Sequence, residues 1–152
     1  MSGGHRLQTL FELRDQAVDD AQNAWRQAAT ALASQEAEQR RLSARAQALQ
    51  AQVQIVATSL GGRTAAAFAL RDRFLAQLRV EAQASHMAQL SHSQSALAHA
   101  LRCEQQSRDA LVQAQQELKL LQRHRDNADL HARKRDERRA DADVDDWSLG
   151  RR

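Results

Sequence analysis

The chain has 152 residues, contains no Pro and no Tyr, and has only five Gly. Aromatic residues make up 3% of it, too few for the thick core of an ordinary globular domain. Ala, Gln, Leu and Arg are abundant and are good helix formers, so the composition predicts an all-α protein. The formal net charge of +3, spread over both signs, is weak evidence for a nucleic-acid partner.

A regular apolar pattern runs from Val18 to Leu60. Positions separated alternately by three and four residues are apolar except at Gln35 and Gln39, and polar residues fill the spaces between them. A 3.5-residue repeat held for about six heptads predicts a helix that lies along another helix in a left-handed coiled coil. Leucines further upstream extend the helix, so we predict it over about 6–59, with residues 1–5 frayed.

A turn is predicted over 60–64, because Gly61 and Gly62 form the only internal Gly pair and suit a tight reversal. Thr64 then suits the N-cap of the next helix. Trp25 occupies one of these regularly spaced apolar positions, which together form the apolar seam between the two helices. We expect its side chain to fill space opposite small residues.

The second helix is predicted over about 65–138. Its heptad pattern changes phase between Leu78 and Leu90, and the later heptad includes Glu104. Two long helices joined by a short turn must run antiparallel. We therefore predict a single elongated all-α domain, made of two long helices in an antiparallel coiled-coil hairpin.

A strongly charged segment follows the last seam residues. Residues 123–139 hold seven Arg or Lys against four acids, and four Asp follow between 141 and 146. We expect the helix to fray between about 135 and 142, which leaves a charged tail over 139–152. Trp147 in this tail either packs back on the helices or anchors a partner. No aromatic side chain interleaves the basic residues, so protein docking is favoured over nucleic acid.

Motifs for catalysis are absent, so we predict neither enzymatic activity nor a cofactor. His92 and His99 lie seven residues apart, but no further ligands complete a metal site beside them, and we interpret the histidines as surface or seam-edge residues. Cys103 is the only cysteine, which favours a reducing compartment. No signal peptide or membrane-spanning run is found, so we expect a cytoplasmic protein.

One row of residues early in the second helix recurs at i,i+4 spacing: Phe74, Leu78, Ala82 and His86. Such a row drifts around the helix and out of a 3.5-residue seam, so part of it is expected to face outward. Phe74 and Leu78 also suit the core.

These features resemble the FliJ/YscO family, the stalk proteins of flagellar and virulence type III secretion systems. The resemblance covers almost the whole chain and rests on its length, the Leu-x-x-Leu start (Leu7 and Leu10), the two Ala/Gln/Arg-rich helices and the short turn. The charged end, Arg-Lys-Arg-Asp-Glu-Arg-Arg at 133–139 followed by acids, also matches. The acidic tail with Trp147 and the His/Ser-rich middle of the second helix depart from the pattern and slightly favour the virulence branch.

The resemblance implies an antiparallel coiled coil similar to that of the ATP synthase γ subunit, inserted in the hexameric export ATPase, with its turn end reaching the export-gate membrane protein. Secretion chaperones are further candidate partners, and the location implied is the cytoplasmic base of the apparatus. The gate contact implied is the row Phe74, Leu78, Ala82 and His86. The ring contact implied is formed by basic residues near both ends of the chain: Arg6, Arg14, Arg133, Lys134, Arg135, Arg138 and Arg139.

The sequence is compatible with three functions. The leading one is a monomeric hairpin adaptor that promotes assembly or activity of the export ATPase without hydrolysing ATP itself. The second is a self-assembling structural coiled coil, in which Gly61 and Gly62 serve as a hinge. The third is a basic helix that binds nucleic acid, with a steep salt dependence centred on 123–139.

Overall fold

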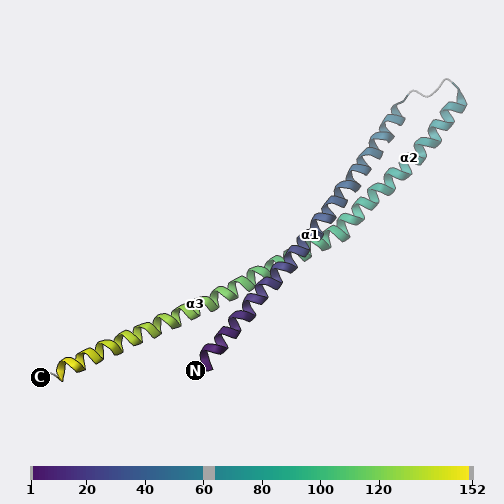
Figure 1. Cartoon of the computed structure of the whole chain (residues 1–152). Coiled ribbons are helices and arrows are strands. Elements are labelled where there is room, and N and C mark those ends of the chain that lie inside the picture. Colours follow the sequence, from purple (N-terminus) through teal and green to yellow (C-terminus); the bar gives the residue numbers. More distant parts are fainter. Residues whose placement is uncertain (1, 60–63, 151–152) are drawn as a thin grey trace. The chain divides into compact units, whose positions relative to one another are not determined.

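The computed structural model describes the backbone of residues 2–59 and 64–150. They form helices α1 (Ser2–Thr58), α2 (Ala65–His92) and α3 (Ala98–Leu149), with a π-helix, η1 (Ser93–Leu97), between α2 and α3 (Figure 1). No β-strand occurs in this part of the chain. The predicted all-α class, with two long helical arms, is therefore confirmed. Over the same residues, no helix has a stretch long and apolar enough to cross a membrane.

The helical arms are longer than predicted at both ends of the chain. α1 begins at Ser2 rather than near Arg6. Gly3 and Gly4 each disfavour a helix by about 1 kcal/mol relative to Ala, but their backbone groups still supply its hydrogen bonds, so they do not exclude a helical start. α3 continues to Leu149, so the tail predicted from residue 139 is wrong. No Pro or Gly lies between Thr64 and Gly150, and charged side chains on an exposed helix do not by themselves end it.

Thr64 is the N-cap of α2, as predicted. Its backbone is extended, and its side-chain oxygen accepts a hydrogen bond from the backbone N–H of Ala67 at 3.2 Å. This bond satisfies one of the donors that the first turn of a helix leaves open. The predicted turn at Gly61 and Gly62 lies outside the described residues.

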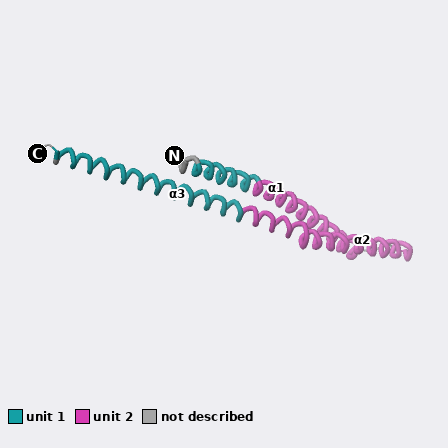
Figure 2. The backbone as a smooth tube through the Cα atoms, turned by 90° about the horizontal axis from the view of Figure 1, so that it is seen from below, with its two compact units in different colours: residues 1–23, 109–152 teal, residues 24–108 magenta. Residues whose placement is uncertain are grey.

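The chain divides into two compact units, which Figure 2 distinguishes by colour. The seam unit comprises residues 24–108, and the terminal unit comprises residues 1–23 and 109–152. Each is described by itself below.

Within the seam unit, α1 packs antiparallel against α2, η1 and the start of α3. Val53 packs with Leu75 and Leu78 near the turn end, Gln35 and Gln39 contact His92, and Trp25 contacts Glu104. The partner number rises as the α1 number falls, as antiparallel packing requires. The buried residues of the unit form a thin line along the helices: Val53, Leu75, Leu78, Ala82, Ser85 and Ala100.

The π-helix η1 marks a one-residue slip in the seam. Before it, the seam positions of α2 are 75, 78, 82, 85 and 89, in the 3-4 spacing of a heptad. After it, the positions are 97, 100, 104, 107 and 111, one residue later than the first series predicts. A π-turn inserts one residue into an α-helix, so η1 absorbs this offset.

The slip corrects the prediction in two respects. The phase change lies at 93–97 rather than between Leu78 and Leu90, and Leu90 is 41% exposed instead of occupying the seam. Ser95 supplies a local cause for the irregular turn, because its hydroxyl donates to the Ser91 carbonyl oxygen at 2.6 Å. A hydroxyl that bonds back to the preceding turn competes with the backbone ladder and bends helices.

In the terminal unit, the start of α1 packs antiparallel against α3. Arg14 forms an ion pair with Glu117, and the guanidinium of Arg125 lies over the ring of Phe11, 4.6 Å from its centroid. None of the side chains described in this unit is buried. Its packing therefore rests on half-buried side chains and on charged groups at the edge of the seam.

Candidate functional site

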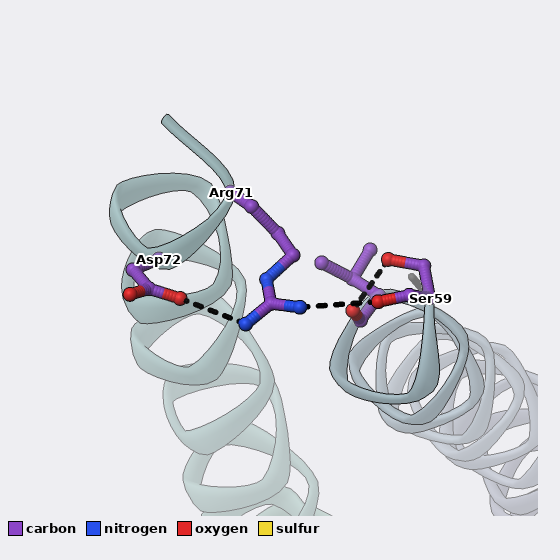
Figure 3. A network of polar contacts seen from close by, with 4 residues as sticks. Ser59, Arg71 and Asp72 are labelled. Atoms are coloured by element: carbon purple, nitrogen blue, oxygen red, sulfur yellow. Dashed lines mark hydrogen bonds and ion pairs between the residues drawn. The ribbon is translucent and has the colours of Figure 1, made fainter. Parts of the chain in front are cut away.

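Arg71 holds the turn end of the seam unit together. Its Nη1 donates to the carbonyl oxygen of Ser59 at 3.1 Å, and its Nη2 lies 3.3 Å from Oδ1 of Asp72 (Figure 3). The same guanidinium lies 5.4 Å from the centre of the Phe68 ring. Ser59 directly follows α1, where the last carbonyls of a helix lack partners within the helix. Arg71 thus caps α1 from α2.

The row expected to contact the export gate is split by the structure. Leu78 and Ala82 are buried in the seam, at 6% and 8% exposure, whereas Phe74 is 54% exposed and His86 is also exposed. Each four-residue step turns about 40° around a helix, so the row enters the seam in its middle and leaves it at both ends. Part of the row therefore faces outward, as expected, but its four side chains do not share one exposed face.

Further apolar side chains are exposed near this end of the seam unit. Ile55, Leu70 and Val80 are each about two-thirds exposed, and Met87 lies exposed seven residues after Val80, on nearly the same helix face. Val80 and Met87 point away from the seam. The sequence pattern did not single them out, because isolated apolar residues between heptad positions carry little information about exposure.

A polar cluster interrupts the seam beside η1. Nδ1 of His92 lies 2.7 Å from Oε1 of Gln39, and Nε2 lies 2.8 Å from Oε1 of Gln35. All three residues are half-buried. The two glutamines are the polar residues that interrupt the apolar heptad of α1. His92 on the opposite helix contacts both of them, which explains why polar side chains occupy these two positions. We call this group the His92 clip.

Other candidate sites resolve into ordinary packing. Trp25 is half-buried at its seam position, and its indole N–H donates to a carboxylate oxygen of Glu104 at 2.9 Å. His99 contacts the sulfur of Cys103 at 3.5 Å. Within the described residues, no group of three or more His, Cys, Asp or Glu is placed to hold a metal ion.

The basic residues expected at the ATPase ring fall into two groups. Arg6 is exposed, while Arg14 is engaged with Glu117. The remaining five belong to the basic block, defined as residues 133–139, whose side chains are all exposed on α3: Arg133, Lys134, Arg135, Arg138 and Arg139.

An acidic block, defined as residues 141–146, follows on the same helix, and its side chains are exposed as well. The basic block carries a net charge of +3 and the acidic block one of −4. The net charge of the two blocks together is slightly negative, which is unfavourable for binding the phosphates of a nucleic acid. Trp147 directly follows the acidic block and is 63% exposed, within the helix rather than in a tail.

Comparison with known proteins gives one family. The model of the YscO-like protein family matches residues 3–150, nearly the whole chain. No curated protein and no solved structure matches the chain. The chain therefore belongs to the YscO-like family, which is the FliJ/YscO family of structural components of type III secretion systems.

Proposed function

We propose that this protein is a non-enzymatic stalk of a type III protein export apparatus. It inserts in the hexameric export ATPase, promotes assembly or activity of the ring, and links the ring to the export gate. The family match over residues 3–150 carries the proposal. The thin antiparallel seam supports it, because a stalk has to be narrow enough to enter a ring and has no need of a catalytic pocket.

Arg6 and the basic block are the proposed contacts with the ATPase ring. Their side chains are exposed and project from the terminal unit. Exposed ion pairs contribute about 0–1 kcal/mol each, so several of them give steering and register without locking the stalk in place. Arg14 is proposed as a lesser contact, because it would first have to leave Glu117.

Phe74 and His86 are the proposed contacts with the export-gate membrane protein. Leu78 and Ala82 support them from the seam rather than reaching the gate themselves. The site of action is the cytoplasmic base of the secretion apparatus, where secretion chaperones are further candidate partners.

Light-scattering mass and ATP turnover test the ring contact. The purified chain is mixed at low concentration with the hexameric export ATPase and a non-hydrolysable nucleotide. We expect one copy of the chain per hexamer and, with ATP, faster turnover by the ring. A ring that neither binds the chain nor changes its turnover would contradict the proposal.

Charge reversal separates the ring contact from general electrostatics. R133E/R135E/R138E should weaken ring binding at least about tenfold, because each lost attraction becomes a repulsion. R26E/R40E/R45E, which reverses three exposed arginines of α1 in the seam unit, is the matched control and should bind like the native chain. In a parallel assay, F74A should weaken binding to the gate protein while leaving ATP turnover unchanged.

A further inference from the structure

The distal part of α3 is a helix with exposed side chains and a divided charge. Every described side chain from 133 to 148 is exposed. The ion pairs that the structure shows between described residues lie elsewhere, at Arg14, Arg41, Arg71 and Arg125. Two charge blocks, one basic and one acidic, therefore stand side by side on one helix with their side chains directed to solvent.

A helix of this kind is complementary to itself when it is reversed. The basic block and the acidic block lie on either side of Ala140, and their net charges are +3 and −4. When two such helices lie antiparallel with their Ala140 residues near one another, each basic block faces the acidic block of the other copy. When they lie parallel, like charges face one another, which is unfavourable.

An apolar stripe runs along the same helix. Positions 130, 133, 137, 140, 144 and 147 follow the 3-4 spacing of a heptad seam, and four of the six carry Leu130, Ala140, Val144 and Trp147. Leu130 and Val144 are 49% and 64% exposed. The other two positions hold Arg133 and Glu137, so the stripe supports only weak pairing, and charge complementarity has to supply its direction.

We propose that two copies of the chain associate through antiparallel pairing of residues 130–147. The interface has the two-fold symmetry of most homodimers, since the same helix serves both partners. The association is weak and salt-dependent, because its ion pairs are exposed to water. It uses the basic block that we assign to the ATPase ring, so pairing and ring binding compete for one surface. The pairing itself does not depend on that assignment.

Sedimentation equilibrium of the full-length chain over a range of concentrations tests the pairing. We expect an average mass that rises with concentration from the 17.0 kDa of one chain toward that of two. Raising NaCl from about 0.05 M to 0.5 M should weaken the association at least about tenfold, because the Debye length falls from above 10 Å to below 5 Å. A mass that stays at 17.0 kDa at the highest concentration would overturn the proposal.

A charge-swap pair tests whether the two charge blocks carry the pairing. One variant, D141K/D143K/D145K/D146K, makes both blocks basic, and the other, R133E/K134E/R135E/R138E/R139E, makes both acidic. Each variant alone should remain monomeric, while an equal mixture should form a dimer of one chain of each kind. Circular dichroism verifies that both variants stay helical. R40E/R45E is the control and should associate like the native chain. Variants that still self-associate alone, or a mixture that stays monomeric, would refute pairing through these charge blocks.

Discussion

His92, Gln35 and Gln39 show how single polar residues specify a thin seam. Ala and Leu in the remaining seam positions would tolerate sliding of one helix along the other, because one small apolar side chain replaces another with little change in contact. A histidine that bonds two glutamines four residues apart fits at one register only. Buried polar residues at heptad positions play this role in other coiled coils.

Replacing His92 by Ala should lower the free energy of unfolding by about 1 kcal/mol, because two half-buried amides lose their partner and are not fully rehydrated. H131A is the control: it makes the same change of helix propensity at an exposed position of α3 and should alter stability by less than about 0.5 kcal/mol. Urea unfolding followed by circular dichroism measures both. Equal stability of the two variants would show that the clip contributes nothing.

For single residues, the sequence indicated which seam positions are unusual but not which side chains contact one another across the seam. Gln35 and Gln39 stood out as polar exceptions, and His92 as a seam-edge histidine, but pairing them requires the cross-seam register. That register depends on the length of the turn and on the one-residue slip at η1. Arg71 was missed for a similar reason: its acceptor, the Ser59 carbonyl, belongs to the backbone and leaves no mark in the sequence pattern.

The π-helix η1 reconciles two heptad frames on one continuous helical arm. Each frame is regular, and the two frames differ by one residue. In an unbroken α-helix, the apolar positions on one side of η1 would therefore turn away from α1. The extra residue is accommodated within the five residues of η1, so both frames remain in contact with α1. The cost is a local break in the α-helical hydrogen-bond ladder.

Deleting Ser95 should restore one uninterrupted heptad frame through α2 and α3. We expect the melting temperature to stay the same or to rise, because the deletion removes both the extra residue and its competing hydroxyl. Deleting Gln116, an exposed residue within the regular second frame, should instead create a slip and lower the melting temperature by about 5 °C or more. Thermal unfolding by circular dichroism compares the two deletions. A Ser95 deletion as harmful as that of Gln116 would contradict the frame argument.

The helices were the most predictable part of the molecule. Alternating three- and four-residue spacing over many turns identifies a coiled-coil helix, and Thr64 marked the start of α2 within one residue. The distal end of α3 was mispredicted because the apolar seam and the helix were assumed to end together. Residues 133–148 show that a chain without Pro or Gly can continue as a helix after its packing partner has ended.

For the molecule as a whole, burial is unevenly distributed along the chain. All side chains that are buried among the described residues belong to the seam unit, and the terminal unit has only half-buried ones. Local stability follows the apolar area removed from water and the protection of backbone hydrogen bonds. The terminal unit should therefore open more readily than the seam unit. This suits a segment proposed to exchange partners.

Hydrogen exchange measured by mass spectrometry should show this difference directly. We expect amides of residues 30–58 to exchange at least about tenfold more slowly than those of residues 115–145, since opening of the terminal unit exposes less apolar surface. A matched measurement in denaturing urea should abolish the difference. Uniform protection along α3 would contradict a stability gradient, and would instead indicate that the distal helix is held by a partner.

Trp25 and Trp147 are the only tryptophans, in a chain that lacks Tyr. One indole is half-buried and bonded to Glu104 in the seam unit, and the other is exposed beside the acidic block. The native protein thus carries two intrinsic fluorophores in unlike surroundings. A chain with Trp147→Phe reports on the seam alone, and a chain with Trp25→Phe reports on the acidic block alone. Opening of the coiled coil and occupation of the distal helix can therefore be followed separately, by emission wavelength and without an attached dye.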